Sequence, residues 1–156
     1  MRIYLSEQTK KKLFEVIQKA GNKETGGILM GEYITDDTYK IVDFTIQKTS
    51  GTVFSFQRLL DGFVDPLKHF FKKTNFNYRK YNYLGEWHTH PNFSVQPSST
   101  DIESMFEIVE DSLTNANFAV LLIIRINSDN QLECSANVFY LGGMISAEIL
   151  IDDIYE

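Results

Sequence analysis

The stretch GEWHTHPNFSVQPSSTD, residues 85–101, decides the fold and indicates the chemistry. It contains His88 and His90, two of the three histidines in the sequence, and it ends at Asp101. Residues 83–90 are predicted to form a strand, and side chains at positions i and i+2 of a strand point to the same face. Both imidazoles then emerge side by side, with Asp101 one turn-rich loop away. Two nitrogens, one carboxylate oxygen and one open position are what a catalytic zinc ion requires, so the pattern predicts a zinc site.

The same residues have a second, purely structural interpretation. Ser98 and Asp101 precede a run with helical apolar periodicity and have the spacing of a capping box, with Asp in place of the usual Glu. Each histidine, taken singly, is also consistent with a half-exposed polar residue on a strand. Two such histidines, a proline directly after them and an aspartate at the head of a helix are much less expected together by chance. We therefore favour the metal site and keep the capping role of Ser98 open.

The diagnostic residues of the stretch are His88-Thr89-His90-Pro91, Pro97-Ser98 and Asp101. They resemble the JAMM motif of MPN-type (Mov34/PAD-type) zinc metalloproteases. That motif reads H-[S/T]-H-P, with seven residues between the second histidine and a serine, and two more before an aspartate. The match has no gap, and the wording GEWHTHP is closest to the compact prokaryotic JAB-domain branch. The family also has a glutamate far upstream, and Glu24 in ETGGILMGEY stands at the corresponding position.

The resemblance implies a role for each of these residues. The expected zinc ligands are His88, His90 and Asp101. Glu24 is expected to accept a proton from the attacking water and to deliver it to the leaving amine. Ser98 is expected to donate a hydrogen bond to the oxyanion of the transition state. The implied fold is a single α/β MPN domain of the JAB type, cytidine-deaminase-like, with a mixed β-sheet flanked by helices over residues 1–156.

The resemblance also implies a substrate. Enzymes of this family commonly cut the bond after the Gly-Gly tail of ubiquitin or a ubiquitin-like protein, which implies a deubiquitinase-like zinc isopeptidase or peptidase acting on such a modifier or its conjugate. Prokaryotic relatives occur in operons with ubiquitin-activating-like enzymes, including antiphage operons, so an activating-enzyme-like protein is an implied partner. Two alternatives stay open: a processing peptidase that trims the tail of a small sulfur-carrier protein, and a metal-free MPN scaffold. Scaffold members typically lack one or more ligands, and this sequence lacks none.

Two other classes of protein do not fit the sequence. A zinc deaminase needs H-x-E and P-C-x-x-C, and the single cysteine, Cys134, excludes that pattern. The RadC-like branch of the superfamily has Asn between its histidines, where this chain has Thr89. Cys134 lies in a predicted strand and is expected to pack there as a small hydrophobe.

Composition limits the partners and the compartment. A chain of 156 residues with 43% hydrophobic residues is expected to form one domain with a real core. The net charge of −6 argues against nucleic acid, because binding to a phosphate backbone depends on Lys and Arg. No apolar run approaches the roughly 20 residues of a membrane span, and no secretory leader is visible, so we expect no membrane partner and a cytoplasmic location.

Periodicity and turn residues predict the remaining elements. The predicted helices are 6–20, with Ser6 as N-cap and Gly21 as its end, 67–73 after Asp65-Pro66, and a third helix after Asp101. The predicted strands are 28–33, 39–47, 118–126 and 132–140, followed by an edge strand or short helix over 144–151. Residues 48–63 are interpreted as a loop that in relatives helps to bind an extended substrate tail, although its phenylalanines are equally consistent with core.

Two further expectations concern the site strand. Leu84, Glu86 and the two histidines are expected on one face, and Tyr83, Gly85 and Trp87 on the other. Glu86 is consistent with orienting a metal ligand or with a surface or capping role. His69, alone on a predicted helix, is not counted as a ligand.

Overall fold

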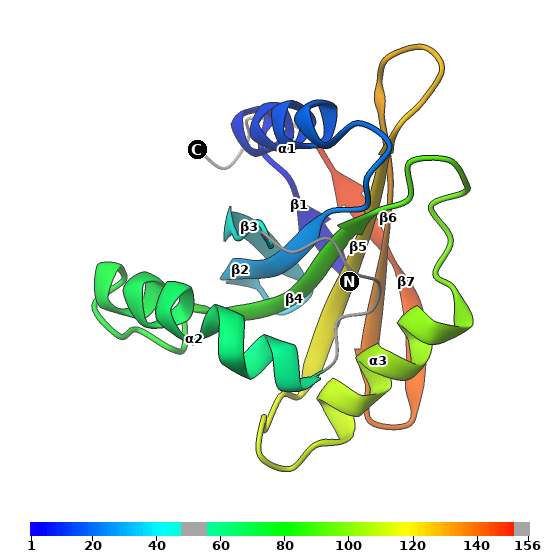
Figure 1. Ribbon diagram of the computed structural model, residues 1–156. Coiled ribbons are helices and arrows are strands. Elements are labelled where there is room, and N and C mark those ends of the chain that lie inside the picture. The colour runs from blue at the N-terminus through cyan, green and yellow to red at the C-terminus, as the bar shows by residue number, and fades with distance from the viewer. Residues whose placement is uncertain (48–55, 152–156) are drawn as a thin grey trace.

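The structure, a computed structural model, describes residues 1–47 and 56–151, and for residues 56–63 it describes only the helical backbone. Over these ranges the strands form one mixed sheet in the order β1-β3-β2-β4-β5-β6-β7 (Figure 1). The sheet closes on itself because β1 pairs in parallel with both β3 and β7. The strands are β1 Arg2–Tyr4, β2 Gly26–Thr35, β3 Thr38–Phe44, β4 Tyr81–Thr89, β5 Phe118–Ile126, β6 Leu132–Tyr140 and β7 Gly143–Leu150.

Helix α1, Glu7–Ala20, covers one face of this sheet (Figure 1). It begins and ends as predicted: the Ser6 Oγ accepts a hydrogen bond from Thr9 N at 3.1 Å, and Gly21 follows with φ +61°. Leu13 and Ile17 point into a core shared with every strand except β7, which adds partly buried residues at its edge. The core members are Ile3, Leu5, Leu13, Ile17, Leu29, Ile41, Leu84, Trp87, Val120, Leu122, Ile124, Ala136 and Val138.

Helices α2, Phe56–Lys73, and α3, Ser99–Glu110, cover the opposite face (Figure 1). Their core is separate from the first and uses the alternate residues of the central strands. Its members are Ile28, Met30, Phe70, Val95, Met105, Ile108, Val109, Ala119, Leu121, Ile123 and Phe139. Both faces of β5 are therefore buried, which explains its uninterrupted apolar run.

Helix α2 begins well before the predicted residue 67, and Pro66 lies inside it. The prediction placed Asp65-Pro66 at the helix start because proline is favoured in the first turn. In the sequence, however, apolar residues at 56, 59, 60, 63, 67, 70 and 71 keep one helical stripe through the proline. The predicted loop over 48–63 is thus wrong for residues 56–63, and its remainder, residues 48–55, lies outside the described residues.

A β-bulge in β4 changes which side chains share a face. Leu29 pairs with Gly85 but Met30 pairs with Tyr83, so Leu84 is an extra residue in the strand. Leu84 therefore joins Trp87 in the core under α1, and Tyr83 packs on the other side with the α2 and α3 core. The predicted faces of Leu84 and Tyr83 were wrong because regular alternation does not hold across a bulge.

The bulge depends on Gly85, which has φ +154°. A Cβ at Gly85 would lie 1.9 Å from the Val120 carbonyl oxygen. A Cβ at Gly27 would similarly lie 2.1 Å from the Thr45 carbonyl oxygen, so a second backbone segment also approaches this glycine closely.

The other predicted strands are present, although β2, β3 and β4 begin and end a few residues away from their predicted bounds. Strands β5 and β6 have the predicted bounds, and Cys134 packs against the core under α1 as expected. Residues 143–150 form a strand, which was one of the two predicted alternatives for this segment. Strand β7 is not an edge strand, however, because it pairs with β6 on one side and with β1 on the other. Strand β1 was not predicted, since three residues are too few to show a period. None of the described helices is long and apolar enough to cross a membrane.

Candidate metal centre

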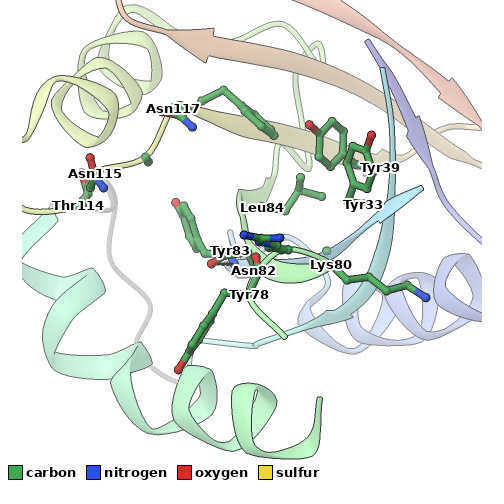
Figure 2. Close-up of a pocket in the computed structure, with 14 residues that line it drawn as sticks. Tyr33, Tyr39, Tyr78, Lys80, Asn82, Tyr83, Leu84, Thr114, Asn115 and Asn117 are labelled. Atoms are coloured by element: carbon green, nitrogen blue, oxygen red, sulfur yellow. Dashed lines mark hydrogen bonds between the residues drawn. The ribbon is translucent and has the colours of Figure 1, made fainter. Parts of the chain in front are cut away.

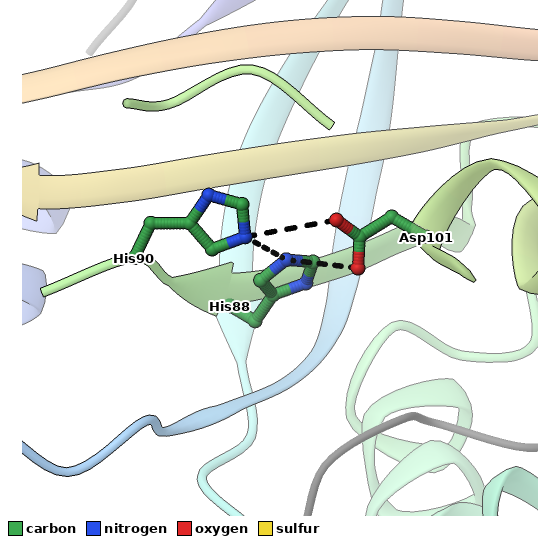
Figure 3. A group of neighbouring side chains, drawn as sticks. All are labelled: His88, His90 and Asp101. Carbon is green, nitrogen blue, oxygen red and sulfur yellow. Dashed lines mark hydrogen bonds and ion pairs between the residues drawn. The ribbon is translucent and has the colours of Figure 1, made fainter. Parts of the chain in front are cut away.

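His88, His90 and Asp101 converge at the carboxyl end of β4 and the amino end of α3 (Figure 3). The Nε2 atoms of the two histidines lie 3.1 Å apart. Asp101 Oδ1 lies 3.3 Å from His88 Nε2, and Asp101 Oδ2 lies 3.6 Å from His90 Nε2. The parallel crossover from β4 through α3 to β5 produces this meeting, because it directs the end of the strand and the start of the helix to the same edge of the sheet.

These separations are the distances expected between the ligand atoms of a small divalent cation. Zinc bonds to nitrogen and oxygen are about 2.0–2.1 Å, so tetrahedral ligand atoms lie about 3.3 Å from one another. The observed distances of 3.1, 3.3 and 3.6 Å surround that value. The three side chains are also largely buried, with exposed fractions of 13%, 5% and 19% for His88, His90 and Asp101. Two imidazoles and a carboxylate in this arrangement fit zinc.

His90 lies one residue beyond the end of β4 and is oriented by the loop that follows it. Its Nδ1 lies 2.7 Å from the Ser94 carbonyl oxygen, and its backbone N donates to the Ile124 carbonyl at 3.1 Å. A hydrogen on Nδ1 leaves the Nε2 lone pair to face the other ligand atoms. The loop is held in turn by Arg125, which donates to the Phe93 carbonyl at 3.1 Å, and by Ser135, which hydrogen-bonds the Val95 carbonyl.

Asp101 is oriented by the predicted capping box. Ser98 Oγ accepts from Asp101 N at 3.1 Å, and Asp101 Oδ2 accepts from Ser98 N and from Ser98 Oγ, each at 2.7 Å. Burial alone would raise the pKa of the Asp101 carboxyl, but the hydrogen bonds and charge of His88, together with the Ser98 hydrogen bonds, outweigh it. The pKa of Asp101 therefore lies well below its ordinary value, and the carboxylate is ionised and ready to bind a cation. The structural interpretation of Ser98 is confirmed.

Glu24 lies in the loop between α1 and β2 and is exposed. The next residue, Thr25, is hydrogen-bonded to Thr89, which lies between the two histidines: Thr25 N donates to Thr89 Oγ1 at 2.9 Å, and Thr89 N donates to Thr25 O at 2.9 Å. Gly26 pairs with His88 in the sheet. These contacts hold the backbone next to Glu24 against β4, the strand that carries His88. The Glu24 side chain forms no hydrogen bond to another described residue.

Glu86 is the polar residue whose environment the sequence left open. It is 2% exposed, which excludes the surface role, and it lies on the same face as His88. Burial, aided by the negative charge of Asp101, raises the pKa of its carboxyl to about 8.

The Ser94 carbonyl that orients His90 could not be found from sequence, because any residue type supplies a backbone oxygen.

The structure also contains a pocket that lies away from His88, His90 and Asp101. A pocket of about 340 Å³ lies at the opposite end of β4, and its lining includes Tyr33, Tyr39, Tyr78, Asn82 and Tyr83 (Figure 2). None of the candidate zinc ligands lines it. His69 is exposed on α2, and it is not part of the cluster, as expected.

The chain is similar to known proteins in sequence and in fold. The model of the family described as prokaryotic homologs of the JAB domain matches residues 6–136. The chain is 34% identical over 139 residues to the CD-NTase/cGAS isopeptidase of Enterobacter hormaechei subsp. hoffmannii, a match that covers 87% of this chain and 74% of that protein. It is 28% identical over 102 residues to the ubiquitin carboxyl-terminal hydrolase RPN11 of Saccharomyces cerevisiae, covering 65% of this chain but only 32% of RPN11.

Solved structures share the fold. A protein from Desulfitobacterium hafniense superposes with a TM-score of 0.68 at 20% identity, covering 96% of this chain and 92% of that one. A JAB1/MPN domain protein from Archaeoglobus fulgidus has a TM-score of 0.50 at 14% identity, covering 96% and 98%. From the family match, the relatives and the shared fold together, the chain belongs to the prokaryotic homologs of the JAB domain.

Proposed function

We propose that the protein is a zinc-dependent isopeptidase or peptidase that hydrolyses the bond after the C-terminal tail of a ubiquitin-like modifier. The observation that carries the proposal is the convergence of His88, His90 and Asp101, whose ligand atoms all lie within 4.8 Å of one another. The names of two relatives support it: one is an isopeptidase and the other a ubiquitin carboxyl-terminal hydrolase. A complete ligand set argues against the alternative of a metal-free scaffold.

The two histidines and Asp101 would hold the zinc ion. When bound, zinc supplies a Lewis acid that polarises a carbonyl group and lowers the pKa of water to about 7. His90 keeps its Nε2 directed at the ion through its contact with the Ser94 carbonyl, and Asp101 keeps its carboxylate there through the capping box. Both contacts fix geometry before substrate arrives, which is how an active site avoids reorganisation during the reaction.

Glu24 acts as the general base in this proposal. Its exposed carboxylate accepts a proton from the water that attacks the scissile carbonyl, and it then delivers that proton to the leaving amine. The Thr25–Thr89 hydrogen bonds support the assignment, because they hold the Glu24 backbone beside the ligand strand. Ser98 donates its hydroxyl hydrogen to the oxyanion in the transition state, which requires that it leave Asp101 Oδ2 when substrate binds.

The proposed substrate is a conjugate of a ubiquitin-like modifier, with an activating-enzyme-like protein as partner in the same pathway. The Enterobacter relative supports a conjugate as substrate, because it is named an isopeptidase of CD-NTase/cGAS. Half-exposed Phe93 supplies an apolar surface beside the ligands, since its ring centroid lies 4.3 Å from that of His90 and the residue is 49% exposed. An extended tail would find a hydrophobic contact there.

Zinc content tests the metal centre directly. Elemental analysis of the purified protein should find about one zinc per chain, and His90→Ala should remove it. His69→Ala is the matched control, because this exposed histidine on α2 lies outside the cluster and its loss should leave the metal in place. A wild-type protein that takes up no zinc after reconstitution would overturn the metal centre.

Cleavage tests the reaction. The zinc-loaded protein should release a reporter joined by an amide bond to the Gly-Gly tail of a ubiquitin-like protein. Glu24→Gln should abolish release and keep the zinc, whereas Glu15→Gln, at an exposed site on α1, should change neither. An active Glu24→Gln enzyme would contradict the general-base assignment. A zinc-loaded wild type that cleaves no such fusion would favour a scaffold.

A further inference from the structure

The loop 91–97 connects His90 to the capping box that holds Asp101, and its backbone makes one of the contacts on which the candidate metal centre depends. The Ser94 carbonyl oxygen lies 2.7 Å from His90 Nδ1. A carbonyl oxygen only accepts hydrogen bonds, so this contact requires a hydrogen on Nδ1 and leaves the Nε2 lone pair for a metal ion. Because the oxygen belongs to the backbone, its position depends on the contacts that hold the loop.

Two side chains of the sheet hold the loop on either side of Ser94. Arg125 Nη1 donates a hydrogen bond to the Phe93 carbonyl oxygen at 3.1 Å, and the Ser135 hydroxyl donates to the Val95 carbonyl oxygen. The Val95 side chain is also buried in the core beneath α2 and α3. The carbonyl groups immediately before and after that of Ser94 are therefore each bound by a side chain.

The register of the sheet places both of these side chains beside the ligand strand. Ser135 on β6 pairs with Ile123 on β5, and Ile123 pairs with His88 on β4. Arg125 follows Ile123 by two residues, so its side chain lies on the same face and further towards the end of β4. In Figure 1 the loop 91–97 runs from this end of β4 past β6 to α3, across the strands that carry its two contacts.

Glu133 fixes the direction of the Arg125 guanidinium. The two residues are directly opposite each other on β6 and β5. Arg125 Nε donates to Glu133 Oε2 at 2.9 Å, and Arg125 Nη2 lies 2.7 Å from the same oxygen. Because the guanidinium is planar and its N–H groups form a fixed fork, these two contacts leave Nη1 for the Phe93 carbonyl. A partly exposed ion pair adds little to stability by itself, so we expect its main effect on the position of the loop.

We propose that Arg125, Glu133 and Ser135 are positioning residues for His90: they hold the loop so that the Ser94 carbonyl keeps the imidazole turned towards the metal ion. None of the three belongs to the candidate ligand set. The same contacts keep the Phe93 ring against the His90 ring, where the centroids are 4.3 Å apart. Groups beyond the ligands that orient them commonly set metal affinity. The inference deepens the metal centre proposed above and rests on it.

Zinc affinity, measured by competition with a chelator, tests this role without depending on activity. Arg125→Met keeps an apolar stem but removes the guanidinium, and it should weaken zinc binding about tenfold, at the low end of the effect of orienting groups. Glu133→Ala should weaken binding by less, because Arg125 still reaches the Phe93 carbonyl. Arg125→Lys keeps a cationic donor and should recover part of the affinity. The double variant Arg125→Met/Ser135→Ala releases both carbonyls and should weaken binding about 100-fold.

Arg2→Met is the matched control for Arg125→Met. Arg2 Nη2 donates to both carboxylate oxygens of Asp37, at 2.8 and 2.9 Å, and Asp37 lies in the turn between β2 and β3. Urea unfolding of the metal-free proteins should show a similar, small loss of stability in both variants, whereas only Arg125→Met should bind zinc more weakly. Equal weakening of zinc binding in the two variants would overturn the positioning role, because lost stability alone would then explain the effect.

NMR of the metal-free protein provides a readout that does not need zinc. Nuclear Overhauser effects between the His90 and Phe93 rings should be present in the wild type and in Arg2→Met, and should be lost in the double variant. Wild-type zinc affinity in the double variant, or unchanged contacts between the rings, would overturn the proposal. A wild-type protein that binds no zinc would overturn the metal centre instead, and the ring contacts would still decide whether these side chains hold the loop against His90.

Discussion

Ser98 and Asp101 hold each other in place by reciprocal hydrogen bonds. Ser98 Oγ accepts from the Asp101 backbone N at 3.1 Å, and Asp101 Oδ2 accepts from the Ser98 backbone N at 2.7 Å. The same Asp101 carboxylate faces both histidines, at 3.3 and 3.6 Å. Asp101 therefore belongs both to the capping box of α3 and to the candidate ligand set, so the start of the helix and the candidate metal centre cannot be changed independently.

Ser98→Ala should affect stability and activity together. Loss of an N-cap hydroxyl lowers the free energy of unfolding by about 1 kcal/mol. Loss of an oxyanion donor slows turnover by roughly 10²–10³-fold. Urea unfolding and the cleavage rate of the zinc-loaded enzyme measure the two effects.

Ser6→Ala is the matched control for Ser98→Ala. Ser6 caps α1 with the same geometry, its Oγ accepting from Thr9 N at 3.1 Å, but α1 carries none of the ligands. It should lose a similar stability and keep full turnover. If Ser98→Ala turns over at the wild-type rate, Ser98 is a capping residue alone.

Much of this site could be predicted from sequence because its signals are local. The spacing of His88 and His90 on a strand and the capping-box spacing of Ser98 and Asp101 follow from short-range geometry, and both hold in the structure. The buried run of β5 and the caps of α1 were equally readable. In each case the residues that decide the outcome lie within a few positions of one another.

The features that could not be predicted depend on distant parts of the chain. Leu84 and Tyr83 changed faces because a bulge forms where Gly85 meets Val120, which is 35 residues away in the sequence. Strand β1 forms only through its pairing with β3 and β7, which lie far away in the sequence. The burial of Glu86 has the same origin, since its neighbours in the sheet, Ile28 on β2 and Leu121 on β5, come from distant parts of the chain.

Gly85→Ala should weaken both the fold and zinc binding. The new Cβ would lie 1.9 Å from the Val120 carbonyl oxygen, so β4 must move away from β5 and take His88 with it. We expect a loss of about 1–3 kcal/mol from the contact, added to about 1–2 kcal/mol from the unfavourable φ. Gly21→Ala isolates the second effect, because Gly21 has φ +61° with nothing within 4 Å. Equal stability of the two variants in urea unfolding would contradict this account of the bulge.

Asp37 contributes to the free energy of unfolding at neutral pH, and this contribution is lost in acid. Hydrogen bonds from Arg2 and Thr38 lower the pKa of Asp37 to about 2, below its ordinary value of 3.8. A carboxyl whose pKa is lower in the folded state contributes stability above pH 4 and loses it as the pH falls towards 2. Asp37→Asn should therefore be less stable than the wild type at pH 7, and the difference should shrink between pH 4 and 2. Thermal unfolding across this range measures the difference, with Asp129→Asn as the control, because Asp129 lies in the β5–β6 turn and forms no ion pair with a described residue.

Phe93→Ala should weaken substrate binding and leave zinc bound. The Phe93 ring packs against the ring of His90 with centroids 4.3 Å apart, and 49% of the residue is exposed, so an apolar surface remains for a substrate tail. Burying the exposed half of Phe93 against a substrate tail strengthens binding by about 1 kcal/mol. Loss of this contact should therefore raise KM roughly fivefold to tenfold. Since the contact exists in both the ground and transition states, kcat should change little. Phe76→Ala is the control, because Phe76 is 57% exposed at the end of α2 and contacts no ligand. Steady-state kinetics in which both variants share the wild-type KM would place the tail elsewhere on the protein.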